Sequence, residues 1–201
     1  MKMRFLLPFL ILIGLSGCAT VAPSTPSNLW VVSTTKDEFS DVVTQMVTVG
    51  SFYSGGATYT QTGKLYPFVG IKNGETYVGI RSGGTYRIPT GTVQIRIDDN
   101  AAWTITPDDT PTDLVPGAAT SPAVNKDISA DMMANMAKIM SPYTAATGDK
   151  ADKIIKQMLA GKVIKYRTIG LNQAASSTGE VKLDASFTES IRSIGIPVGK
   201  P

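Results

Sequence analysis

The sequence predicts a mainly β, α+β domain, an antiparallel β-sandwich or half-barrel with two helices inserted before its last strands. Three observations carry this prediction. Most segments between residues 29 and 105 are β-branched or alternate apolar and polar residues with a period of two, which is typical of half-buried strands. An Asn73-Gly74 pair between two such segments marks a hairpin turn. From about residue 126, apolar residues instead recur every three or four positions, which indicates helices.

The first strands are predicted at 29–32 and 42–49, where β-branched and apolar residues cluster. The segments 65–71 and 76–80 then flank Asn73-Gly74, the strongest short hairpin signal in the chain. A two-residue turn there sets the following residues opposite each other: Lys72 and Glu75, Gly70 and Tyr77, Phe68 and Gly79, Val69 and Val78, Ile71 and Thr76. These cross-strand pairs are chemically compatible, so we expect this register.

A second pair of strands is predicted in the middle of the chain. Residues 92–98 alternate cleanly, with Val93, Ile95 and Ile97 on one face. Residues 103–105 are expected to return as a strand after the turn at 98–100. Residues 107–122 are dense in Pro, Asp and Thr and predict a long loop.

Two helices are predicted near 126–141 and 149–160. The first is indicated by an apolar stripe at helical spacing, which we interpret as a core-facing stripe: Ile128, Met132, Met136, Ile139, Met140 and Tyr143. The second is expected to turn four apolar residues inward and to end at Gly161: Ile154, Ile155, Met158 and Leu159. Strands are predicted at 163–169 and 180–183, and the segment 187–196 is compatible with either a short helix or a strand.

The N-terminus has the pattern of an export signal. Lys2 and Arg4 precede a short apolar run at residues 5–13, which is shorter than the roughly 20 residues that a spanning helix needs. The run ends at the segment Leu15-Ser16-Gly17-Cys18, followed by Ala19. This segment resembles the lipobox of bacterial lipoproteins.

That resemblance implies a diacylglyceryl group on the Cys18 thiol and cleavage just before this residue. It also implies sorting to the outer membrane, facing the periplasm, because Ala19 is not the aspartate that retains lipoproteins at the inner membrane. The alternative is an ordinary cleavable signal with an incidental cysteine. We therefore expect a signal peptide at 1–17, a lipidated Pro-, Ser- and Thr-rich tether at 18–28 and a single mostly β domain at 29–201.

The order of features along this domain resembles invasion-associated-locus-B-like periplasmic β-sandwich proteins. The features are Trp30, the segment 36–41, the strand around Arg96-Ile97-Asp98, a helix ending at Gly161, and a closing segment at Phe187. Such proteins often carry a cysteine pair, whereas this chain has one cysteine. The resemblance implies an envelope accessory or interaction protein without a defined reaction.

Several classes of catalytic site are excluded by composition. The chain has no histidine, which removes Ser-His-Asp triads and histidine metal sites. Ser33 and Lys36 match the S-x-x-K pattern of penicillin-interacting serine enzymes, but the S-D-N and K-T-G motifs of that family are absent. We interpret this match as the end of a strand.

Two further clusters keep alternative functions open. Carboxylates in the loops around 98–113 could serve a hydrolase or a Ca²⁺ site, although turn chemistry explains aspartates there more simply: Asp98, Asp99, Asp108, Asp109 and Asp113. Methionines of the two helices could offer thioethers to Cu(I), although methionine at helical spacing is more typical of a core: Met132, Met133, Met136, Met140 and Met158.

Charge gives no indication of a nucleic-acid partner. Removing Lys2 and Arg4 with the signal leaves 17 of the 19 cations against 16 anions, which is nearly neutral.

Taken together, these features lead us to expect a membrane-anchored periplasmic lipoprotein that is not an enzyme, needs no cofactor or metal, and binds an envelope protein or a cell-wall component. Exposed aromatics near Tyr53, Tyr59 and Tyr66 would favour this function over the hydrolase and the copper alternatives.

Overall fold

The computed structural model describes residues 29–50, 52–54, 57–115, 130–170 and 177–198. The predicted signal peptide, Cys18 and the tether therefore lie outside the described residues, as do Gly55, Gly56 and residues 116–129. Within the described part, none of the helices is long and apolar enough to cross a bilayer.

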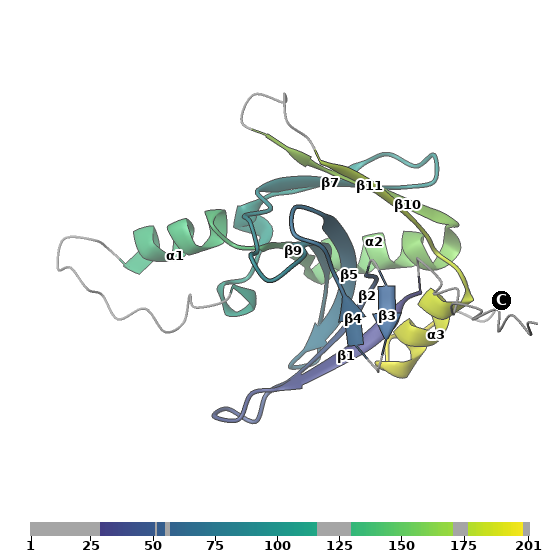
Figure 1. Cartoon of the computed structure of the whole chain (residues 1–201), viewed down its shortest axis with the longest axis horizontal. Coiled ribbons are helices and arrows are strands. Elements are labelled where there is room, and N and C mark those ends of the chain that lie inside the picture. Colours follow the sequence, from purple (N-terminus) through teal and green to yellow (C-terminus); the bar gives the residue numbers. More distant parts are fainter. Residues whose placement is uncertain (1–28, 51, 55–56, 116–129, 171–176, 199–201) are drawn as a thin grey trace, which may run out of the picture.

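Two antiparallel sheets form the body of the molecule (Figure 1). The five-stranded sheet has the order β1-β2-β5-β6-β9, with bounds Val31–Lys36, Val43–Thr48, Leu65–Lys72, Glu75–Ser82 and Tyr143–Thr147. The four-stranded sheet has the order β11-β10-β7-β8, with bounds Thr178–Lys182, Val163–Ile169, Thr92–Ile97 and Trp103–Ile105. The remaining elements are the small hairpin β3 (Phe52–Ser54) and β4 (Ala57–Tyr59), the helices α1 (Ala130–Ile139), α2 (Gly148–Ala160) and α3 (Ala185–Ser193), and the 3-10 turns η1 (Pro107–Asp109) and η2 (Thr112–Leu114). The predicted mainly β, sandwich-like α+β fold is confirmed.

The hairpin formed by β5 and β6 has the predicted register. All five predicted residue pairs, from Lys72 opposite Glu75 to Phe68 opposite Gly79, are found. Asn73 and Gly74 have φ angles of 52° and 79°, the left-handed conformations that a type I′ turn requires at both central positions.

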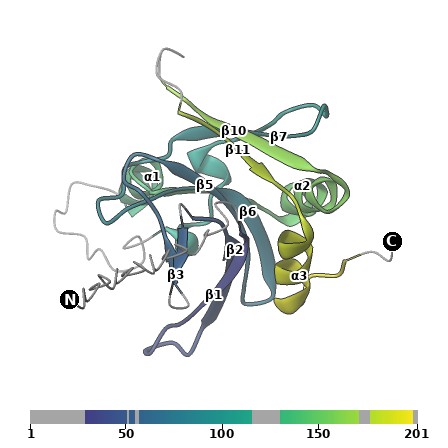
Figure 2. The ribbon, with the colours of Figure 1, turned by 45° about the vertical axis from the view of Figure 1, so that its right-hand side comes forward.

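The main core lies between the two sheets. The inner faces contribute Val69, Val78 and Ile80 from one sheet and the predicted Val93, Ile95 and Ile97 from the other, all 0% exposed. Helix α2 packs on β6 and β9, and α3 packs on β1 and β2 (Figure 2). Each fully buried aliphatic side chain contributes roughly 1.5–3 kcal/mol, so these strands and helices hold the sandwich together.

Trp30 joins the first strand to the last helix. Its ring centroid lies 4.8 Å from that of Phe187, and its Nε1 donates to the Lys182 carbonyl oxygen at 2.7 Å. The segment 187–196, which is compatible with a helix or a strand in the sequence, begins within helix α3, and this helix ends at Ser193. Its N-cap is Asp184, whose carboxylate accepts from the Ser186 N–H at 3.0 Å.

Strand β9 was not predicted. Tyr143 was assigned to the apolar stripe of the first helix, but α1 ends at Ile139 and Tyr143 begins a strand that pairs with β6. Its centre, Thr144-Ala145-Ala146, contains two alanines, which are poor strand formers in isolation. The free edge of β6 fixes this conformation, and that edge is a tertiary feature.

The predicted burial of the α1 stripe is wrong. Four members of the stripe are 55–63% exposed: Met132, Met136, Ile139 and Met140. The helix packs against η1 and η2 and extends from one side of the molecule (Figure 1). Helical periodicity revealed the stripe correctly, but periodicity does not say which surface, if any, covers it.

Gly161 follows the end of α2 as predicted, but for a different reason. Its φ is −91°, so it does not provide a left-handed cap. A Cβ at this position would lie 2.3 Å from Cγ2 of Ile97. Close packing of the helix end against β7 therefore explains the glycine.

Candidate functional site

The outer face of the four-stranded sheet concentrates positive charge. Because Ile95 and Ile164 point into the core, their strand neighbours point outward. The register then sets Arg96 of β7 directly opposite Lys165 of β10, and Gln94 opposite Arg167. On its other side, Lys165 lies opposite Glu180 of β11. We call these five outward residues, Gln94, Arg96, Lys165, Arg167 and Glu180, the basic face.

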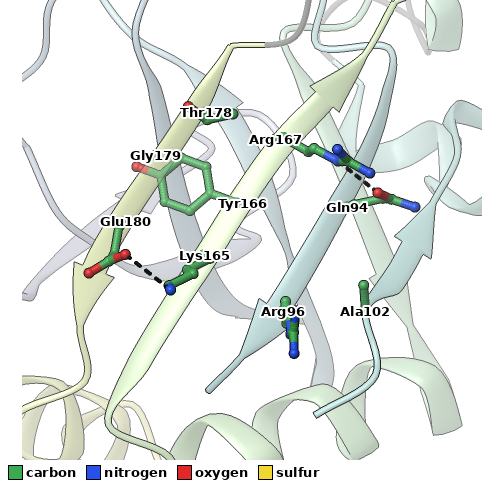
Figure 3. A pocket seen from close by; sticks show the side chains of 9 residues that line it. All are labelled: Gln94, Arg96, Ala102, Lys165, Tyr166, Arg167, Thr178, Gly179 and Glu180. Carbon is green, nitrogen blue, oxygen red and sulfur yellow. Dashed lines mark hydrogen bonds and ion pairs between the residues drawn. The ribbon is translucent and has the colours of Figure 1, made fainter. Parts of the chain in front are cut away.

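The basic face surrounds an open cavity of about 530 Å³ (Figure 3). Thr178, Gly179, Tyr166 and Ala102 complete its lining. Three cations and one carboxylate therefore meet at a single depression. Cations directly opposite each other in a sheet repel, so the pair formed by Arg96 and Lys165 is unfavourable unless an anion lies nearby.

The charges on this face are only loosely compensated. Lys165 Nζ lies 3.6 Å from Glu180 Oε2, and both side chains are about 60% exposed. Arg96 Nη2 lies 3.8 Å from Oδ1 of Asp99. Such exposed pairs contribute little, typically about 0–1 kcal/mol. An incoming carboxylate can therefore compete for these cations at small cost.

Arg167 is the least compensated cation of the three. Its Nε donates to Gln94 Oε1 at 2.8 Å, and Gln94 Nε2 donates in turn to Thr104 Oγ1 at 3.1 Å. This chain of hydrogen bonds orients the guanidinium across three strands. Among the residues that the structure describes, no carboxylate forms an ion pair with Arg167.

The floor of the cavity is rigid and uncharged. Tyr166 turns inward from β10, and its hydroxyl donates to the Leu65 carbonyl oxygen of the other sheet at 3.0 Å. Burial, and to a smaller extent nearby Tyr66, raises the pKa of Tyr166, so the phenol stays protonated. Gly179 lies opposite Tyr166, and a Cβ there would come within 2.3 Å of the ring.

The Ser33 and Lys36 motif does not form a serine-enzyme site. Both residues belong to β1, whereas that chemistry needs the serine at the start of a buried helix. Lys36 instead forms an exposed ion pair with Asp41 at 2.6 Å. The interpretation of the motif as part of a strand is confirmed.

Besides Asp99, which lies near Arg96, three of the five aspartates around 98–113 connect separate segments of the chain. Asp98 accepts from the backbone N–H groups of Lys162 and Val163, which ties the β7 turn to β10. Asp109 accepts from Thr106 N–H at 2.7 Å and from Lys150 Nζ at 3.0 Å. Asp113 forms an ion pair with Lys72 at 3.0 Å. In the described ranges, no group of three or more acidic or cysteine side chains is placed to hold a metal ion.

The expected aromatic surface is found in part. Tyr59 is 47% exposed, but Tyr66 is only 5% exposed, and the side chain of Tyr53 lies outside what the structure describes.

The basic face was not predicted from the sequence. Its signal was present within one strand, since Lys165 and Arg167 alternate with Ile164 and Tyr166, but their alignment with Arg96 depends on strand pairing.

Cys18, the predicted lipidation site, lies outside the described residues, so the structure does not bear on it. Comparisons with protein-family models, with curated proteins and with solved structures give no significant match to this chain, so the fold and the site stand on their own geometry.

Proposed function

We propose that this chain is a membrane-anchored lipoprotein of the bacterial cell envelope. It acts as a non-catalytic accessory module that binds a carboxylate-bearing partner, an acidic protein surface or the cell wall, through its basic face. The observation that carries the binding proposal is the strand register that gathers Arg96, Lys165 and Arg167 around one open cavity with a single carboxylate in its lining.

The anchor is proposed from the lipobox-like segment that ends at Cys18. One acyl chain gives only reversible attachment, at about 0.8 kcal/mol per buried CH₂, whereas the diacylglyceryl group supplies two chains. The Pro-rich residues 18–28 would then let the domain reach away from the outer membrane into the periplasm. Location near the partner raises the effective concentration of the domain there.

The anchor is tested by labelling cells with a radioactive fatty acid. We expect label in the natural protein and none after residues 1–18 are replaced by a standard cleavable signal. Cys18→Ser is a less clean variant, because an uncleaved signal would itself hold the precursor at the inner membrane. Absence of label in the natural protein, or its recovery in the soluble periplasmic fraction, would contradict the anchor.

A non-catalytic role is supported by the contacts of the candidate catalytic groups. Asp98, Asp109 and Asp113 each hold neighbouring segments together through their carboxylates, so they already have structural roles. The basic face offers donors and charge but no base poised beside a nucleophile. Its chemistry fits recognition of an oxyanion, with the two arginines able to form paired hydrogen bonds to a carboxylate.

The binding proposal is tested by photo-crosslinking in intact cells from a probe at Thr178, which lines the cavity. We expect the crosslinked partner to disappear in Arg167→Glu and Lys165→Glu, and to weaken as salt is raised. Lys156→Glu, which makes the same charge change on the exposed side of α2, is the matched control and should keep the partner. Equal effects of all three variants would reject the basic face as the binding surface.

The exposure of the α1 stripe favours a second candidate function, Cu(I) binding. Met132, Met136 and Met140 follow at four-residue intervals, and Met140 N–H donates to the Met136 carbonyl oxygen at 2.9 Å, so helical geometry continues to Met140. Thioethers are soft ligands that select Cu(I). Stoichiometric Cu(I) binding in a competition titration, lost in a Met132→Leu/Met136→Leu double variant, would support this function, and binding no stronger than in that variant would reject it.

A further inference from the structure

Two arginines lie near one tyrosine on the outer face of the five-stranded sheet. Arg81 of β6 is directly opposite Tyr143 of β9 in the register. Arg87, from the segment after β6, contacts the Tyr143 ring: its guanidinium carbon lies 5.5 Å from the ring centroid, and its Nη1 donates to the Tyr143 hydroxyl at 2.5 Å. Cations from two different segments are therefore placed beside Tyr143.

Both cations lack an anionic partner among the described residues. The ion pairs of the described chain involve neither Arg81 nor Arg87. Arg81 Nε donates to Thr48 Oγ1 at 3.2 Å, and its guanidinium lies 5.8 Å from the Tyr66 ring centroid. Among the residues that the structure describes, no acceptor is found for the two Nη groups of Arg81, which can form paired hydrogen bonds to oxyanions.

This arrangement is costly as it stands. Arg81 is half-buried, and burial lowers its pKa; Tyr143 acts in the opposite direction, and the charge of Arg87 adds to the lowering. Arginine nevertheless remains protonated in proteins. A partly buried charge without a counter-charge is destabilising, and a second cation nearby adds repulsion. An anion between the two guanidinium groups would relieve both penalties.

We propose that Arg81 and Arg87, beside Tyr143, form a binding site for an oxyanion, the carboxylate or phosphate group of a small ligand. Thr48 and Tyr143 position the two guanidinium groups, and the edge of Phe68, whose ring centroid lies 5.9 Å from that of Tyr143, fixes the tyrosine from the side. This site lies on the five-stranded sheet and is independent of the basic face, which belongs to the outer face of the four-stranded sheet.

The test is calorimetric titration of the purified full chain in detergent with sodium phosphate and, separately, with sodium acetate, at ionic strength matched by sodium chloride. We expect saturable binding of at least one anion. Arg87→Gln should weaken it by about tenfold or more, as expected for loss of a charged hydrogen bond. Arg87 is exposed and follows the strand, so this variant should fold even if Arg81→Gln does not.

Two controls separate this site from other cations. Arg192→Gln removes an exposed arginine of α3, and Lys156→Gln removes an exposed cation of α2 that lies outside the basic face. Both should leave the affinity unchanged. A larger effect with phosphate or with acetate identifies which oxyanion the site prefers. Failure of both anions to bind, or binding that Arg87→Gln leaves unchanged, overturns the proposal.

Discussion

The hydroxyl of Tyr166 and the carbonyl oxygen of Leu65 join the two sheets across the core through one buried hydrogen bond of 3.0 Å. The two residues are 101 positions apart in the sequence. The same tyrosine forms the floor of the cavity on the basic face. This hydrogen bond therefore links the strand that carries the basic face to the five-stranded sheet, in addition to the apolar core between the sheets.

Tyr166→Phe tests the contribution of this bond. Removing the hydroxyl leaves a buried carbonyl without this donor, which typically costs about 1–3 kcal/mol. We expect the free energy of unfolding in urea to fall by that amount. Tyr86→Phe, at a tyrosine that is 82% exposed, should change it by less than about 0.5 kcal/mol. Equal stability of the two variants would show that the bond does not hold the sheets together.

Gly179→Ala tests the close approach of β11 to the Tyr166 ring. The added methyl group would lie 2.3 Å from the ring, which is too close for any pair of carbon atoms, so the ring must move. Because the hydroxyl of that ring is tied to Leu65, we expect a loss of about 1–3 kcal/mol. Thr178→Ala, at the exposed neighbouring position, is the control.

A double-mutant cycle sharpens this prediction. In a Tyr166→Ala background the ring is absent, so Gly179→Ala should lose most of its effect on the free energy of unfolding. A penalty that remains the same in both backgrounds would mean that the alanine disturbs the backbone rather than the tyrosine.

Asp109→Asn should reduce the loss of stability in acid. Burial acts to raise the pKa of Asp109, but the Thr106 N–H and the Lys150 ammonium outweigh it and hold the pKa below its ordinary value. The folded chain then binds fewer protons than the unfolded chain below about pH 4, where an unperturbed aspartate titrates. The stability contributed by this carboxylate is present above that pH and is lost as the pH falls through the folded pKa.

The measurement is the melting temperature between pH 2 and pH 6. The wild type should be more stable than Asp109→Asn at pH 6, and the difference should shrink toward pH 2. Asp108→Asn, at the exposed neighbour, should follow the wild-type curve. A difference between wild type and Asp109→Asn that stays constant with pH would contradict the assigned role of the carboxylate.

Local features of this fold could be predicted from the sequence, and features set by distant contacts could not. The β5–β6 register follows from a two-residue turn, because Asn73 and Gly74 fix both the turn type and the alignment of the strands. Strand β9 forms because it pairs with the edge of β6. The residues Thr144-Ala145-Ala146 do not by themselves predict a strand.

The candidate sites show the same division. The outward alternation of Lys165 and Arg167 is visible within a single strand. The approach of Arg167 to Gln94, 73 residues away in the sequence, depends on the pairing of β10 with β7. Likewise, nothing near Arg87 in the sequence indicates that its guanidinium meets Tyr143, 56 residues away.

Methionine substitutions test which of the two helices, α1 or α2, buries its apolar face, because helical periodicity alone does not show this. Met136 of α1 is 56% exposed, whereas Met158 of α2 is 0% exposed and packs in the main core. Met158→Ala should cost about 2–5 kcal/mol, from lost burial and the cavity left behind. Met136→Ala should change the free energy of unfolding by less than about 0.5 kcal/mol, because alanine is also the better helix former. Urea denaturation of the two variants makes the comparison with the same side chain removed from each helix. A cost above about 2 kcal/mol for Met136→Ala would mean that the Met136 side chain is buried and that the α1 stripe is part of the core.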